Sequence, residues 1–181
     1  MVAIPEFAMG AMENWGLVTY REVDLLIDDA TASSRQLQRV AEVVIHELAH
    51  QWFGNLVTME WWDDLWLNEG FASWTQTLAL DALFPDWGMW TQFICDDQST
   101  AMRLDAMRTS HPIQVPIKHA EEVEEVFDMI SYCKGASVVR ILHAVLGAEA
   151  FQAGLQIYME RHQYGNTITT DLWKAWEEVS E

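Results

Sequence analysis

Cysteine, positive charge and long apolar runs are all scarce in this sequence. Its 181 residues include only two cysteines, Cys95 and Cys133, too few for a disulfide framework, which favours a reducing compartment. Lysine and arginine total 10 against 28 aspartates and glutamates, a formal net charge of −18 that would repel nucleic-acid phosphates. No apolar run reaches the roughly 20 residues of a membrane-spanning helix, and the start lacks a signal-peptide pattern. We therefore predict a cytoplasmic protein with no nucleic-acid partner and no membrane span in this chain.

Apolar and aromatic residues are plentiful by contrast. Half of the chain is apolar and it contains 10 tryptophans, enough to build a substantial core. The chain is predicted to be one domain or part of one. Met1 leads straight into strand-like sequence, and Glu181 falls inside a helical pattern with no cap. We expect an excerpt from a larger protein.

The hydrophobic pattern predicts a mainly α chain with a small N-terminal β portion (α+β). Residues 1–30 form the predicted β-rich segment, with short β-like runs at 18–20 and 25–27. Residues 31–181 form the predicted helical lobe, which starts at a polar capping stretch, 31–34. The helices are expected over residues 35–55, 63–84, 89–107, 120–128, 130–146, 149–161 and 170–178.

Three ionisable residues interrupt the apolar run VIHELAHQWFGN at residues 44–55. At about 100° per residue, His46 and His50 lie about 40° apart on one helix face, one turn from each other. Both imidazoles can then reach one Zn²⁺ ion. Glu47 lies beside them and can take a proton from a water molecule at the open metal position, which is the logic of His-Glu-x-x-His in zinc peptidases. The alternative is a helix with two ordinary, hydrogen-bonded histidines.

The same helix carries an apolar stripe. Its members are spaced three and four residues apart, and they are Leu37, Val40, Val44 and Leu48. The two histidines fall on the opposite face, which continues the polar side of the helix.

A third ligand decides between a metal site and ordinary histidines. The metzincin spacing is excluded, because Phe53 and Leu56 stand where it needs glycine and histidine. The downstream carboxylates are Glu60, Asp63, Asp64 and Glu69. Glu69 fits best, because an antiparallel second helix that begins near residue 63 brings it level with the histidines. We predict Glu69 as the third ligand; a glutamate paired with a distant arginine is the alternative.

Two motifs together resemble the M1 family of zinc aminopeptidases. One is His46-Glu47-x-x-His50 followed after eighteen residues by Glu69 within Asn68-Glu69-Gly70-Phe71-Ala72. The other is the exopeptidase motif Gly10, Ala11, Met12, Glu13 and Asn14. The resemblance extends through residues 61–68 and 131–135 and so covers essentially the whole chain. It is strongest to the puromycin-sensitive branch.

The resemblance implies an incomplete thermolysin-like catalytic domain with one Zn²⁺ held by His46, His50 and Glu69, and Glu47 as general base. It implies that Glu13 binds the free amino group of a peptide and that Gly10, Ala11, Met12 and Asn14 also bind substrate. Tyr132, followed by Cys133 and Lys134, resembles the family's catalytic tyrosine. Cys133 is expected to be a spectator. The implied partners are peptides with a free N-terminus and the missing N- and C-terminal domains of a parent enzyme.

Three other functions stay open. A zinc endopeptidase would keep the histidine motif but would not need Glu13 as an amine anchor. An epoxide hydrolase similar to leukotriene A4 hydrolase would share the zinc site. A fragment of such an enzyme could bind metal without turnover. The other histidines have no ligand-like spacing and are expected to be structural or on the surface: His111, His119, His143 and His162.

Overall fold

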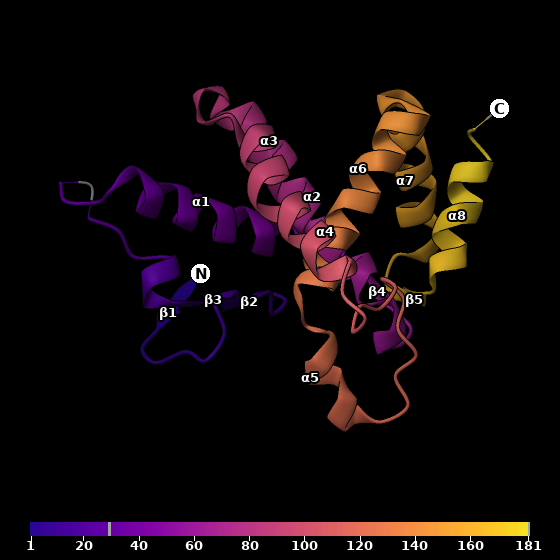
Figure 1. Cartoon of the computed structure of the whole chain (residues 1–181), viewed down its shortest axis with the longest axis horizontal. Coiled ribbons are helices and arrows are strands. Elements are labelled where there is room, and N and C mark those ends of the chain that lie inside the picture. Colours follow the sequence, from indigo (N-terminus) through magenta and orange to yellow (C-terminus); the bar gives the residue numbers. More distant parts are fainter. Residues whose placement is uncertain (29, 181) are drawn as a thin grey trace.

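The computed structural model describes residues 1–28 and 30–180, and it combines a small N-terminal β-rich segment with a lobe of packed helices (Figure 1). The strands are β1 (Val2–Ile4), β2 (Ala11–Met12), β3 (Thr19–Arg21), β4 (Val57–Met59) and β5 (Gly165–Thr167). The expected mainly helical fold with a small N-terminal β portion is confirmed. The division at residues 30 and 31 stays a prediction.

The helices alternate with short irregular turns. The α-helices are α1 (Ser34–Ala49), α2 (Trp66–Leu83), α3 (Met89–Gln92), α4 (Ser99–Asp105), α5 (Val123–Val126), α6 (Gly135–Leu146), α7 (Ala148–His162) and α8 (Thr169–Glu177). The 3₁₀ turns are η1 (Glu22–Asp24), η2 (Trp62–Asp64), η3 (Pro85–Trp87) and η5 (Ala120–Glu122). Two π-helical segments are η4 (Phe93–Gln98) and η6 (Ile130–Lys134).

The N-terminal sheet has the strand order β1-β3-β2. Thr19 pairs with Val2 in parallel register and with Met12 in antiparallel register, so β2 lies at one edge of the three strands. The strand expected at residues 25–27 is wrong: the chain turns through η1 instead, and the amide groups of Leu25 and Leu26 donate to the carbonyl of Glu22. A run of three apolar residues cannot become a strand unless a neighbouring strand pairs with it.

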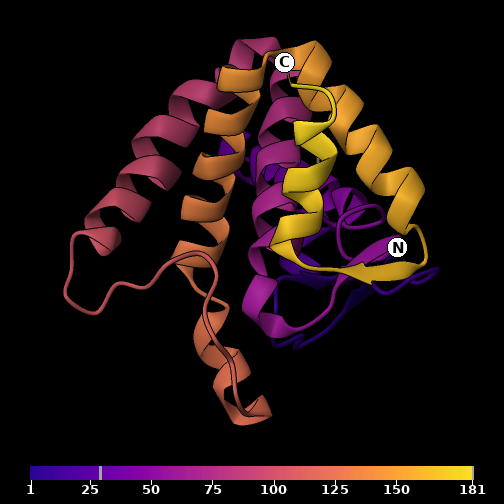
Figure 2. The same ribbon diagram turned by 90° about the vertical axis from the view of Figure 1, so that its right-hand side faces the viewer.

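Helix α2 is the centre of the helical lobe. It packs most extensively against α6 and α1, while α7 packs on α8 (Figures 1 and 2). Its side chains are apolar on nearly every face, as expected for a helix enclosed by others. The buried ones include Trp66, Leu67, Phe71, Ala72, Trp74 and Leu80. The helix ends at Leu83 because Pro85 disfavours helical conformation at the residue before it.

Helix α1 begins at a capping box in the expected polar stretch. The Ser33 hydroxyl accepts from the Gln36 amide, and the Gln36 side chain accepts from the Ser33 amide. The helix buries its histidine face and not the whole apolar stripe: Glu47 and His50 are 5% and 1% exposed, whereas Leu37 and Leu48 are 39% and 47% exposed. A face with charged residues that is buried this deeply needs compensating partners.

Two glycines let α2 and α6 approach closely. A Cβ atom placed on Gly70 would lie 3.0 Å from the backbone of Gly135, closer than a side chain tolerates. Gly70 directly follows Glu69, so this contact fixes the turn of α2 that carries the predicted third ligand.

The helices expected over 89–107 and 130–146 are present, but each contains a π-helical segment. These segments, η4 and η6, contact each other, and the Cys133 thiol donates to Asp97 Oδ1 over 3.5 Å. Segments of this kind occur often at functional sites, because the extra residue redirects side chains. Among the described residues, no single helix has the length and hydropathy to cross a membrane, although the bent pair Ala120–Val126 and Ile130–Leu146 reaches them jointly.

Candidate functional site

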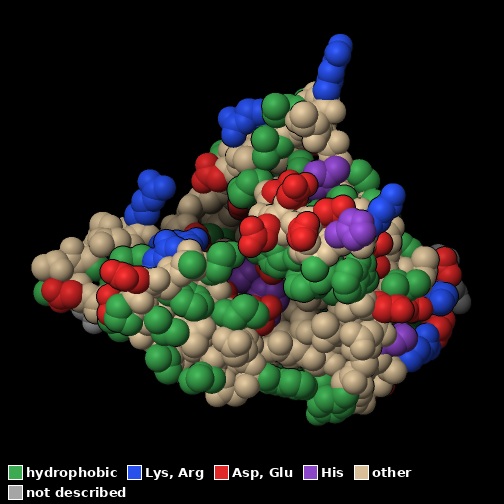
Figure 3. Space-filling model, turned by 90° about the horizontal axis from the view of Figure 1, so that it is seen from below, with side chains coloured by type: hydrophobic (Ala, Val, Ile, Leu, Met, Phe, Trp, Pro, Cys, Tyr) green, Lys and Arg blue, Asp and Glu red, His purple; other side chains and the backbone are tan. Residues whose placement is uncertain are grey.

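The three predicted ligands converge between α1 and α2. His46 Nε2 lies 3.1 Å from His50 Nε2 and 3.2 Å from Glu69 Oε2, and His50 Nε2 lies 3.3 Å from the same Glu69 oxygen. The histidines come from the last turn of α1 and from its C-cap, and Glu69 comes from the first turn of α2. Figure 3 shows histidine surface at the bottom of a hollow on the face seen from below.

The outer nitrogen of each imidazole has its own partner. His50 Nδ1 lies 2.9 Å from the backbone carbonyl of Phe53, and His46 Nδ1 lies 3.2 Å from Gln76 Oε1. A carbonyl oxygen can only accept a hydrogen bond, so both contacts favour the tautomer with hydrogen on Nδ1. Each Nε2 then directs a lone pair at the other and at Glu69, an arrangement that needs a positive charge at its centre.

The cluster fits a divalent metal ion. Three donor atoms on a tetrahedral zinc ion with bonds of about 2.0–2.1 Å would lie roughly 3.3 Å apart, close to the distances found. The three atoms also lie within 4.8 Å of one another, and the set of two imidazoles and one carboxylate matches that of known zinc hydrolases. Without a cation, a proton must take this place: burial opposes it, but Glu69 raises the pKa of His50 to about 9.

Glu47 lies next to the cluster with one oxygen free. Its side chain is buried, and Oε2 has no hydrogen-bond partner within the described residues. Burial, with further repulsion from Glu13 and Glu69, raises the pKa of Glu47 to about 7 although His50 opposes the shift. A carboxylate in this range can both accept and return a proton near neutral pH.

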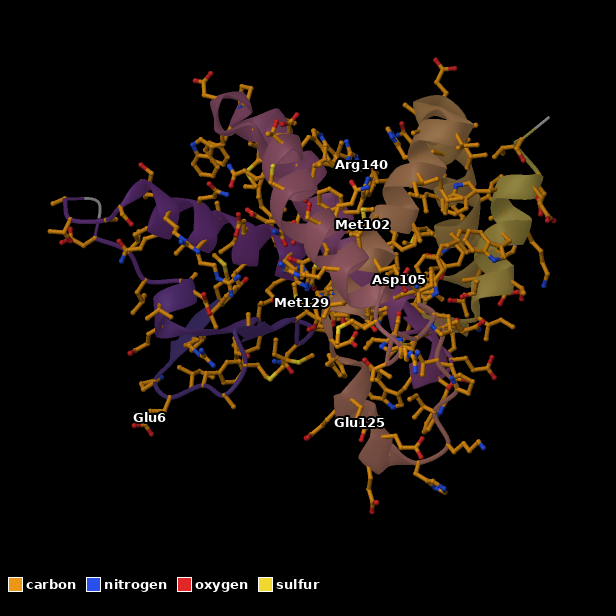
Figure 4. All side chains as sticks on the ribbon, viewed as in Figure 1. Glu6, Met102, Asp105, Glu125, Met129 and Arg140 are labelled. Carbon is orange, nitrogen blue, oxygen red and sulfur yellow. The ribbon has the colours of Figure 1, made fainter. Side chains whose placement is uncertain are left out.

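A cavity of about 450 Å³ opens beside the cluster. Its wall includes His46, Glu47 and Tyr132 together with Gly10 and Ala11, the first two residues of the N-terminal motif. Met129, labelled in Figure 4, also lines it, where the β-rich segment approaches the helical lobe. The other members of the wall come from the N-terminal segment beside Gly10, from α1, α2, α3 and α6, and from the two π-helical segments.

Tyr132 lies on η6 beside the first imidazole. Its ring centroid is 6.1 Å from that of His46, with the rings nearly parallel. Burial and the nearby Glu69 raise the pKa of the Tyr132 phenol, so the hydroxyl keeps its proton and remains a donor. The sequence alone gave no structural reason for Tyr132 to lie in the cavity wall. The π-helical turn of η6, which carries Tyr132, provides one.

The N-terminal motif reaches the cluster from the opposite side. The Glu13 backbone carbonyl accepts from Asn55 Nδ2 over 2.9 Å, and Glu13 Oε1 lies 3.7 Å from His50 Nδ1. Asn14 Nδ2 donates to Thr19 Oγ1, which ties the end of the motif to β3. Met12 is exposed on edge strand β2 and does not line the cavity. Of the five predicted motif residues, Glu13 therefore approaches the cluster through His50, and Gly10 and Ala11 line the cavity, whereas Met12 and Asn14 do neither.

The other downstream carboxylates lie outside the cluster. Glu60 is exposed, and Asp63 accepts from the backbone amide of Ile117. Asp64 is buried and accepts from the Thr169 hydroxyl and from Gln114.

Sequence reasoning missed a role for Gln76, the partner of His46. The available signal was its position two helical turns after Glu69, on the same face of α2. Glu42 also lines the cavity, and its sequence signal was its position one turn before His46 on the polar face of α1. Asp97, another residue of the wall, carried no sequence signal.

A model of the peptidase family M1 domain matches residues 1–181. Aminopeptidase M1 of Arabidopsis thaliana is 60% identical over 177 residues, covering 98% of this chain and 20% of that protein. Aminopeptidase M1-C of Oryza sativa subsp. japonica is 60% identical over 180 residues, and alanine/arginine aminopeptidase of Saccharomyces cerevisiae is 52% identical over 180. The chain thus spans about one fifth of the length of these curated relatives.

Proposed function

Because this chain belongs to peptidase family M1, we propose that it forms the metal-binding part of an aminopeptidase that removes the N-terminal residue of peptides. The observation that carries the proposal is the convergence of His46, His50 and Glu69 beside the free oxygen of Glu47. The relatives bear aminopeptidase names, which agrees with this reading.

The metal we propose is a single zinc ion held by His46 Nε2, His50 Nε2 and Glu69 Oε2. The chemistry supplied by such an ion when bound is Lewis acidity, which polarises a carbonyl group and lowers the pKa of water toward about 7. Gln76 and the Phe53 carbonyl orient the imidazoles from behind, as the outer partners of metal ligands do.

Glu47 is the proposed general base. Its Oε2 takes a proton from the attacking water and delivers it to the departing amine. The pKa of about 7 caused chiefly by burial suits both steps. Tyr132 keeps its phenolic proton and donates a hydrogen bond to the oxyanion that develops on the scissile carbonyl.

Glu13 is the proposed anchor for the free amino group. A carboxylate beside the cluster pairs with an ammonium group and sets how far the peptide enters, so that only one residue is removed. Strand β2 lies at the edge of the sheet, where a peptide backbone can pair with residues 10–12 by strand addition.

The test uses the protein expressed from its complete coding sequence. We expect Glu47→Gln to keep its zinc and to lower turnover of an alanyl-amide substrate by roughly 10²–10⁴-fold, because the base is lost while the ligands remain. Glu149→Gln, an exposed carboxylate on α7, is the matched control and should behave as the parent. Turnover close to the parent level in Glu47→Gln would contradict the role of Glu47.

A second comparison separates exopeptidase from endopeptidase activity. An N-acetylated peptide cannot pair with Glu13, so it should resist cleavage, whereas its free-amine counterpart should be cleaved. Equal cleavage of the two peptides would favour an endopeptidase. Assay of an epoxide substrate distinguishes the epoxide hydrolase alternative.

A further inference from the structure

Part of the wall of the cavity beside the cluster is negatively charged. Glu42 of α1 and Asp96 and Asp97 of η4 all line it. Among the described residues of the wall, Arg39 carries the sole permanent positive charge, and its guanidinium is already paired with Asp24 at 2.8 Å. A ligand that enters this cavity therefore meets a net negative wall, although Glu42 also accepts a hydrogen bond from Gln38 Nε2 over 2.7 Å.

Asp97 is held in the wall by two neighbouring π-helical segments. The Cys133 thiol of η6 donates to Asp97 Oδ1, a weak hydrogen bond that leaves the carboxylate poorly compensated. Burial raises the pKa of Asp97. Burial also raises the pKa of Glu42, where the hydrogen bond from Gln38 and the charge of Arg39 oppose the shift and Asp97 adds to it. Arg140, labelled in Figure 4, does not reach the cavity; its guanidinium lies over the Trp90 ring at 5.0 Å and donates to Gln98.

The cavity is a ligand site on independent grounds. Glu47 is 95% buried, lines the wall, and its Oε2 has no partner among the described residues. Such an atom is costly unless a ligand or water molecule completes its hydrogen bonding.

The direction of a bound peptide follows from the positions of Glu13 and the cavity on different sides of the cluster. Glu13 lies on the His50 side, whereas the cavity is lined by His46 and Glu47 and by neither His50 nor Glu13. A peptide with its amino group at Glu13 and its first carbonyl at the cluster directs the following residue into the cavity. This step rests on the proposed function.

We propose that Asp97 and Glu42 select peptides whose second residue is basic. The lysine or arginine side chain at that position enters the cavity and pairs with the two carboxylates, and an acidic side chain is repelled by them. Specificity of this kind is a difference between attraction for one substrate and repulsion of another.

The experiment compares Ala-Lys-Ala-Ala, Ala-Leu-Ala-Ala and Ala-Glu-Ala-Ala with an alanyl fluorogenic amide, which has no second residue. Each kcat/KM is divided by that for the alanyl amide on the same variant. We expect the relative kcat/KM of the lysine peptide to exceed that of the glutamate peptide by roughly tenfold, from one charge interaction in a partly buried site.

The variant Asp97→Asn keeps the shape of the side chain and the acceptor for Cys133, and it should reduce the ratio of lysine to glutamate peptide several-fold. Asp86→Asn, an exposed charge on η3, is the matched control and should leave the ratio unchanged.

Two results would overturn the inference: no preference for the lysine peptide, or a preference that survives in the double variant Asp97→Asn with Glu42→Gln. Absence of hydrolysis of the peptides and of the alanyl amide would instead contradict the proposed function. Retained hydrolysis of the amide without selection at the second residue contradicts only this inference.

Discussion

Helices α1 and α2 meet at the cluster but differ in which of their faces are buried. Helix α1 turns its histidine face inward and leaves Leu37 and Leu48 substantially exposed. Helix α2 is enclosed on nearly every side, and Glu69 is buried in its first turn. The comparison suggests that α2 is the fixed reference of the site, and that α1 is positioned on it through polar residues.

The two imidazoles show the same contrast at the level of single contacts. His50 is held by a backbone carbonyl, that of Phe53, which no substitution removes. His46 is held by a side chain of α2, Gln76. One ligand is therefore oriented by its own chain turn and the other by the neighbouring helix.

Loss of Glu69, the ligand that α2 contributes to the cluster, should have the largest effect on zinc affinity. We expect Glu69→Gln to weaken zinc binding by more than about 100-fold, because loss of a ligand should exceed the 10–100-fold cost of losing an outer partner. Competition with a chelator of known affinity measures this. Asp64→Asn is the control: it removes the charge of another buried carboxylate but lies outside the cluster, so it should reduce stability and spare zinc. Equal loss of zinc in both variants would mean that Glu69 is no more important for zinc binding than a buried carboxylate outside the cluster.

Loss of the contact between His46 of α1 and Gln76 of α2 should have the second largest effect on zinc affinity. We expect Gln76→Ala to reduce zinc affinity by about 10–100-fold, since His46 loses the partner that fixes its ring. Gln76→Glu should restore most of the affinity, because a carboxylate also accepts from Nδ1. Gln92→Ala alters another glutamine of the cavity that touches neither imidazole, and it should leave affinity unchanged. If Gln76→Ala bound zinc normally, α2 would not orient His46.

Sequence reasoning succeeded where the signal is local. The capping stretch before α1, the helical spacing of His46 and His50 and the stop before Pro85 all follow from chemistry within a few residues. The closeness of Glu69 to the imidazoles was also predicted, but from helix bounds that were wrong: α1 ends at Ala49 and not near residue 55, and α2 begins at Trp66 and not near residue 63. The metal-binding and catalytic roles of these residues stay predictions.

Sequence reasoning failed where the outcome depends on distant partners. Residues 25–27 have strand composition but no strand beside them among the described residues. The burial of α1 is set by α2, which covers its histidine face and leaves part of its apolar stripe exposed. The π-helical turns that bring Tyr132 and Asp97 to the cavity arise from packing between η4 and η6, and no local composition marks them.

The contact between Gly70 and Gly135, next to Glu69, allows a smaller change in the position of α2 relative to α1. We expect Gly70→Ala to cost about 1–3 kcal/mol of unfolding free energy through overpacking against Gly135, and to weaken zinc binding roughly tenfold by displacing Glu69. Gly154→Ala is the matched control, since its added Cβ meets Trp176 at the interface of α7 and α8. Denaturant unfolding should show a loss in both variants, and zinc titration in Gly70→Ala alone. Weakened zinc binding in Gly154→Ala would mean that general loosening, and not the position of α2, controls the cluster.

Acidification should give the smallest effect, and it tests the α1 side of the cavity. The pKa of Asp97 is raised by burial, so the carboxylate loses its charge at a higher pH than an ordinary aspartate. The groups that face it are Asp96, Cys133 and Glu42, with Arg39 beside Glu42. We expect the kcat/KM ratio of Ala-Lys-Ala-Ala to Ala-Leu-Ala-Ala to fall a few-fold as the pH is lowered through the raised pKa of Asp97, because the lysine side chain keeps its charge while Asp97 loses its own. The ratio cancels the titration of the catalytic groups, which both peptides share. In Asp97→Asn the dependence should flatten; an equally steep profile there would assign the titration to another group and remove Asp97 from the account of specificity.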